Sequence, residues 1–322
     1  PFDYFSLVQI GSTVVFAAAA WRPETASSLF DHAAPIVSAA AIATLSAICL
    51  SFAAIPSAVE AALSALTGAN SAFIFLRCVL PFCSLTPKRT TIRFATALLQ
   101  SGFYYFLISG IPQPLSLAVF VLTPFAATLI CIMEKPRPIQ VDSQAFSSLV
   151  VRKPFLELFA AILVYAVAMR IFEPRAILAE STGNLTTPIA MLCLIVIAFV
   201  LICVAASVKG EFPFARIYRL TVALLLIAVL APMVLDTIPT PASILFLVIV
   251  NFLTMLYRCI LAYVTYQSGT HPIRVFGIGM SAIALGSFLG NVLGFSLFSS
   301  TLSDMALYPL SLGVAALCIV AA

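Results

Sequence analysis

Four polar residues inside two apolar runs have the types and the spacing to bind a charged ligand. Asn70 and Arg77 lie seven residues apart in one run, and Asn251 and Arg258 repeat that spacing in another. Seven residues make about two helical turns, so each asparagine shares a helix face with its arginine. Each arginine precedes the end of its run by eight residues, which is about 12 Å along a helix. An ionisable group at that depth in a bilayer costs about 2.5 to 3.5 kcal/mol, so a functional role is the default hypothesis.

Two interpretations of these arginines stay open. In the first, Arg77 and Arg258 face a central cavity and offer forked donors to a carboxylate or phosphate, which predicts an anionic small-molecule ligand. In the second, each arginine extends to the nearer membrane interface or bonds carbonyl groups of a neighbouring helix. Asn70, Arg77, Asn251 and Arg258 are therefore the candidate ligand-binding residues.

The sequence carries no pattern typical of catalysis or of a metal site. It has no metal-ligand pair, no serine nucleophile elbow and no two carboxylates at one depth, while His32 and His271 fall in separate loops. We therefore expect no enzyme activity, no catalytic residues, no metal and no cofactor. The eight cysteines lie in apolar runs without CxxC spacing, which predicts packing residues rather than disulfides. They are Cys49, Cys78, Cys83, Cys131, Cys193, Cys203, Cys259 and Cys318.

The composition requires lipid as the solvent. Of the 322 residues, 62% are hydrophobic and only 9% are charged, and the mean hydropathy is +1.15. A soluble fold could not expose such a surface, and apolar runs of about 20 residues predict membrane-spanning helices. The basic residues that give the net charge of +4 are scattered, so we expect the bilayer as partner and no nucleic-acid contact by this part of the chain.

Eleven apolar runs bounded by proline, glycine or charge predict the spans. If residues 57–63 join the third run, the helix would exceed the bilayer core, and Gly68 is the candidate position for a break. The runs cover 4–21, 33–55, 64–85, 91–110, 115–133, 155–172, 187–208, 216–235, 241–266, 274–298 and 305–322.

Small and polar residues within the spans predict helix packing. Gly286, Gly290 and Gly294 form consecutive GxxxG spacings, which let a neighbouring helix approach closely. Gln100 and Asn291 lie mid-span, and a lone amide there more often bonds a neighbouring helix than a ligand.

The polar stretch 134–154 divides five spans from six and is the predicted central loop. Alternating the spans across the membrane collects most basic residues on the side of this loop, while Arg175 lies opposite. The positive-inside rule then predicts a cytoplasmic central loop and a cytoplasmic C-terminus. The residues on the crowded side are Arg22, Lys88, Arg89, Arg93, Lys135, Arg137, Arg152, Lys153, Lys209, Arg216, Arg219 and Arg274.

A short internal repeat divides the chain into two similar halves. Asn70–Leu80 and Asn251–Leu261 share Asn, Arg, Cys and Leu at the same positions, an offset of 181 residues (70 to 251). Both copies run from outside to inside, as parallel repeats do. We predict an N-terminal half-repeat at 1–133 with five spans, the central loop at 134–154 and a C-terminal half-repeat at 155–322 with six spans. A first helix before residue 1 would complete an all-α domain of twelve.

This arrangement resembles the major facilitator superfamily over the whole chain, although residues 21–32 lack the basic Gly-x-x-x-Asp-Arg/Lys-x-Gly loop motif of that family. A closer resemblance is to the membrane domains of bacterial LuxR-type regulators, carried by Pro272–Gly279 with the glycine-rich helix after it and by the Gly68–Arg77 segment. The resemblance implies a small-molecule sensor in the bacterial inner membrane, whose helix-turn-helix domain follows Ala322 and makes the only DNA contact.

From the sequence we prefer the sensing domain of a membrane-bound LuxR-type transcription regulator. The alternative is a major facilitator secondary transporter of a small anionic solute, although no acid lies deep in any span to carry a proton. A scaffold without any ligand is the third interpretation.

Overall fold

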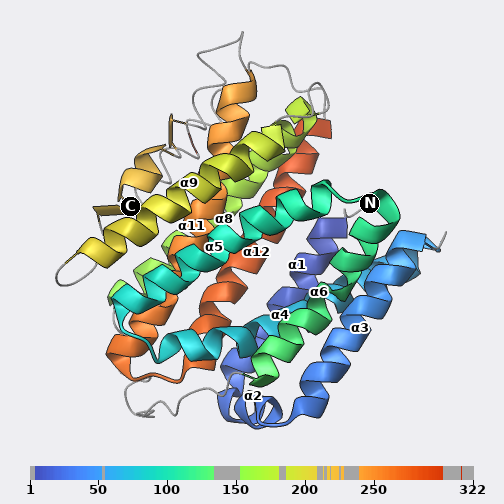
Figure 1. Cartoon of the computed structure of the whole chain (residues 1–322). Coiled ribbons are helices and arrows are strands. Elements are labelled where there is room, and N and C mark those ends of the chain that lie inside the picture. Colours follow the sequence, from blue (N-terminus) through green and yellow to red (C-terminus); the bar gives the residue numbers. More distant parts are fainter. Residues whose placement is uncertain are drawn as a thin grey trace. The chain divides into compact units, whose positions relative to one another are not determined.

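α-Helices form nearly all of the described part of this computed structural model (Figure 1). No strand occurs within the ranges given below. A helix pairs its own backbone groups, which is the solution that lipid demands of an apolar segment. The structure describes residues 4–52, 55–133, 153–180, 186–208, 213, 216–217, 219–224, 226–227, 239–299 and 313.

Nine of the eleven predicted spans coincide with helices of the described chain. The predicted span 216–235 is described only in part, and 305–322 lies almost wholly outside the described residues. The short helix α2 (Pro23–Phe30) precedes the second span. The other helices are α1 (Tyr4–Trp21), α3 (Ala33–Phe52), α4 (Ser57–Cys83), α5 (Pro87–Ser109), α6 (Gln113–Met133), α8 (Lys153–Glu180), α9 (Thr186–Ser207), α11 (Pro239–Ser268) and α12 (Pro272–Ser299).

Six helical segments of the described chain are long and apolar enough to cross a membrane. Their outward side chains are large and apolar, for example Leu129, Ile130 and Phe199, each at least 60% exposed. Lipid would cover such side chains. The six segments are Ala33–Ser51, Ser57–Cys83, Leu115–Met133, Thr186–Ser207, Ser243–Ser268 and Pro272–Ser296.

The break considered at Gly68 is wrong, because α4 runs unbroken from Ser57 to Cys83. Gly68 instead lets α1 approach the backbone of α4. A Cβ atom on Gly68 would lie 1.9 Å from the carbonyl oxygen of Val8, and one on Gly11 would lie 1.8 Å from that of Ala65. Ser12 Oγ also donates a hydrogen bond of 3.0 Å to the Gly68 carbonyl.

The helices gather into two compact units. The first comprises residues 1–86, 108–159 and 261–288, in which α4 contacts α1, α3 and α6, and α3 also contacts α6. Its core contains Ala39, Ala40 and Ile74, and Thr44 Oγ1 donates a 3.2 Å hydrogen bond from α3 to the Val121 carbonyl of α6. Small residues and interhelical hydrogen bonds of this kind hold helices together in lipid.

The second unit comprises residues 87–107, 160–260 and 289–322. Its core contains Ala190, Leu194 and Val248 from α9 and α11. On α12, a Cβ on Gly290 would lie 2.5 Å from the Val167 carbonyl oxygen of α8, so these helices approach closely there. Gly294 similarly lies against Ile171.

Each unit combines segments from both predicted halves. The first takes residues 261–288 from the C-terminal half, and the second takes 87–107 from the N-terminal half. The division of the chain at 134–154 into half-repeats stays a prediction, and the loop itself lies largely outside the described residues.

Candidate functional site

Arg77 is buried within α4, in the first unit. The residue is 5% exposed, and its side-chain atoms Nε and Nη1 are shielded from solvent. Its neighbours Leu76 and Val79 are also buried, so this part of α4 faces other helices. A guanidinium group in such surroundings is costly, which marks the position as a candidate for ligand binding.

Arg258 occupies the matching position on α11, in the second unit. The whole side chain is half-buried, its Nε is shielded, and both Tyr257 and Cys259 beside it are buried. Tyr257 packs against Tyr165 of α8, with ring centroids 6.5 Å apart. Arg77 and Arg258 belong to different units, so a site shared by the two arginines stays a prediction.

The two candidate asparagines make the same local bond. Asn70 Nδ2 donates 2.8 Å to the carbonyl oxygen of Leu66, and Asn251 Nδ2 donates 2.8 Å to that of Leu247. The acceptors, like the donors, lie 181 residues apart (66 to 247). Each amide nitrogen is thus engaged by its own helix.

The packing candidates lie at the positions already described for α12, with Gly290 and Gly294 against α8 and Gly286 buried. The other mid-span amides differ from each other, because Gln100 is exposed and Asn291 is 5% exposed. The described residues contain no group of three His, Cys, Asp or Glu side chains that could hold a metal ion.

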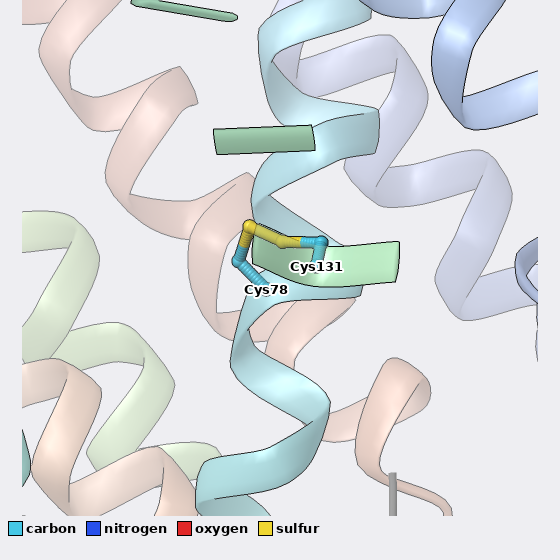
Figure 2. Close-up of a disulfide and its surroundings, with 2 residues drawn as sticks. All are labelled: Cys78 and Cys131. Carbon is cyan, nitrogen blue, oxygen red and sulfur yellow. A yellow bond between two sulfur atoms is a disulfide. The ribbon is translucent and has the colours of Figure 1, made fainter. Parts of the chain in front are cut away.

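The prediction that the cysteines form no disulfide is wrong for one pair. Cys78 of α4 is bonded to Cys131 of α6, with the Cα atoms 5.6 Å apart (Figure 2). Cys78 directly follows Arg77, so the bond lies next to the candidate site. One feature of the sequence could have indicated this pair. Both cysteines lie toward the inner end of a predicted outside-to-inside span, so the predicted topology places them toward the same side of the membrane.

Comparisons with known proteins bear on the fold. No family model and no curated protein matches the sequence. The solved structure of the human organic anion transporter MFSD10 (TETRAN) matches with a TM-score of 0.70 at 14% sequence identity, over 98% of this chain and 81% of that chain. The fold is major-facilitator-like. The six helices that are long and apolar enough to cross a membrane indicate a multi-pass membrane protein, and the predicted all-helical, facilitator-like fold class is confirmed.

In this facilitator-like fold, the start of α12 packs against the C-terminal part of α1. Arg274 Nε donates 3.4 Å to the carbonyl oxygen of Ala20, at the C-terminal end of α1. One turn further along α12, a Cβ on Gly277 would lie 2.7 Å from the Phe16 carbonyl oxygen. The sequence indicated only on which side of the membrane Arg274 lies. Its hydrogen-bond partner is a backbone carbonyl, which every residue has, so no residue type in the sequence points to it.

Two charged side chains, Glu24 and Arg274, lie near His271 in the loop that leads into α12. Burial lowers the pKa of His271 from its ordinary value, the nearby Glu24 of α2 raises it, and Arg274 lowers it. Nδ1 of His271 and Oγ1 of the adjacent Thr270 are buried and have no hydrogen-bond partner among the described residues. Sequence reasoning placed His271 in a loop but could not place Glu24 beside it.

Proposed function

We propose that this chain is a facilitator-type secondary transporter of a small organic anion, and that Arg77 and Arg258 are its anion-binding candidates. The observation that carries the proposal is the burial of Arg77, which is 5% exposed in a membrane helix. An ionisable side chain at that depth is a candidate for a functional role, and a carboxylate matches the planar fork of a guanidinium. The organic anion transporter that shares the fold supports the same class of ligand.

Charge suggests how the proposed site would select its ligand. An anion is attracted to a guanidinium group, and this attraction strengthens where water is excluded. Neutral analogues of the same size lack that attraction and should be rejected.

The test is uptake into proteoliposomes of a panel of mono- and dicarboxylates, with matched neutral amides. Arg77→Gln and Arg258→Gln should each reduce kcat/KM by about thirtyfold or more, since truncating one partner of a buried charge pair costs about 2 to 5 kcal/mol. Arg93→Gln is the matched control, because Arg93 is exposed on α5. Undiminished uptake in both variants, or equal uptake of the neutral amides, would contradict the proposal.

A double-mutant cycle separates one shared site from two independent arginines. If both guanidinium groups bind the same anion, Arg77→Gln and Arg258→Gln should be non-additive, because the second substitution acts on a site already lost. Additive effects would indicate that each arginine acts alone.

The sensor interpretation ranks second. It rests on the LuxR-type resemblance of the Gly68–Arg77 and Pro272–Gly279 segments. Its test is the gene beyond the codon for Ala322, which should encode a helix-turn-helix domain of about 60 to 70 residues, the size of a small domain. The inner-membrane location and the cytoplasmic C-terminus are proposals of the same kind, to be tested with reporter fusions within 134–154 and after Ala322.

A further inference from the structure

The cysteine pair lies near one end of two neighbouring helices. Cys78 precedes the last residue of α4, Cys83, by five residues, and Cys131 precedes the last residue of α6, Met133, by two. These separations correspond to about 8 and 3 Å along the helices. Cys131 is 6% exposed and Cys78 is half-buried. The bond therefore lies within about 8 Å of these helix ends, inside the packed face between α4 and α6.

The predicted topology places that end of both helices in the cytoplasm. Lys88 and Arg89 follow α4, and Lys135 and Arg137 follow α6, so both C-terminal ends are on the predicted inside. The cytoplasm keeps thiols reduced, and disulfides found there are usually transient or redox-sensing rather than structural.

We propose that Cys78 and Cys131 form a reversible thiol–disulfide site that joins α4 to α6 when oxidised. For reduction, a thiolate of a dithiol reductant attacks one sulfur to form a mixed disulfide, and its second thiol releases the protein. Two electrons and two protons pass to the cysteines, and the reductant leaves as a disulfide. Oxidation by a disulfide oxidant reverses each bond change.

The site has a direct structural consequence for α4. Arg77 immediately precedes Cys78, so the bond ties the segment that carries the buried guanidinium to the end of α6. In the reduced state no covalent bond joins α4 to α6, while Ala127 of α6 and Cys78 remain packed around the core of Ala39, Ala40 and Ile74. Redox state would thereby set how freely α4 moves relative to α6. The effect on uptake, but not the thiol chemistry, rests on the proposed transport function.

Thiol counting in native membranes tests the chemistry without any transport. Membranes are equilibrated at graded ratios of reduced to oxidised dithiothreitol, and free thiols are blocked with N-ethylmaleimide in SDS. The remaining disulfide is then reduced, tagged with a maleimide polymer and located by mass spectrometry. We expect the Cys78–Cys131 bond to form and break reversibly across the series. Cys83→Ser is the matched control, since Cys83 is a buried free thiol on the same helix and its loss should leave the titration unchanged.

Two results of the thiol assay would overturn the proposal. A pair that stays oxidised at every ratio in the folded protein is a structural disulfide, and a pair that never oxidises is only two adjacent thiols. A Cys78→Ser/Cys131→Ser variant must lose the tag, which confirms the assignment.

Uptake of a carboxylate is then compared in oxidised and reduced proteoliposomes. Oxidation should change the wild-type rate and leave Cys78→Ser/Cys131→Ser unaffected, whereas an unchanged wild-type rate would overturn the coupling to α4. If the pair titrates but no form of the protein takes up anions, the transport proposal fails and the redox site stands. If uptake is robust but the pair does not titrate, the redox site fails alone.

Discussion

Nζ of Lys88, at the start of α5, donates hydrogen bonds of 2.8 Å to the Ala206 carbonyl oxygen and 3.0 Å to that of Val208, at the C-terminal end of α9. Arg274, at the start of α12, makes the corresponding bond to Ala20 at the end of α1. In each unit a cation thus satisfies the unpaired carbonyls that every helix leaves at its C-terminus and complements the helix dipole.

Replacing this cation should destabilise the fold modestly. Lys88→Met removes a charged hydrogen-bond donor at a half-buried helix end, and we expect a loss of about 1 to 2 kcal/mol in the free energy of unfolding. Thermal unfolding in detergent measures the effect as a lower Tm. Lys88→Arg should retain most of the stability, and Arg89→Met, at an exposed neighbouring position, should change it little. An equal loss in Lys88→Met and Arg89→Met would refute the capping role.

The contact between α1 and α4 should not tolerate a larger residue at Gly68. A methyl group there would meet the Val8 carbonyl at 1.9 Å, so Gly68→Ala must push the helices apart, at a cost of about 1 to 3 kcal/mol. Gly313→Ala is the matched control, because an added Cβ at Gly313 meets no described atom within 4 Å. The readout is the Tm of each purified variant, and a Gly68→Ala protein as stable as the wild type would contradict the contact.

The environment of His271 predicts lower stability in acid. Burial lowers the folded-state pKa of His271 below its ordinary value near 6.5, although Glu24 partly opposes this shift. The unfolded chain then binds a proton at a higher pH than the folded chain. The contribution of His271 to the free energy of unfolding is therefore complete above pH 6.5, and it is lost as the pH falls from 6.5 to the lowered pKa. His271→Gln should flatten the pH dependence of Tm in this window. An unaltered profile would show that other groups cause it.

Charge and geometry at Arg77 can be separated with Arg77→Lys. Lysine keeps the positive charge but offers a single ammonium group in place of the guanidinium fork. We expect the KM for a carboxylate to rise by about tenfold, equivalent to about 1.4 kcal/mol, which is a smaller loss than that expected for Arg77→Gln. Identical kinetics for Arg77→Lys and wild type would indicate that only the charge matters.

Sequence reasoning anticipated less of the site than of the spans. It singled out Arg77, which is buried within α4. It missed the bond between Cys78 and Cys131 and the partner of Arg274. Each of these contacts joins segments that are far apart in the chain, and no local pattern reports them.

The sequence by itself determined that this is a helical membrane protein and where most of its helices begin and end. Both follow from local physics, because an apolar run in lipid must pair its own backbone groups, and proline, glycine and charge mark its limits. Only the tertiary structure decided which helices touch, for example that Gly68 meets α1 rather than breaking α4. Lipid is as apolar as the side chains, so no hydrophobic pattern distinguishes a helix-facing surface from a lipid-facing one, and close packing chooses the partner.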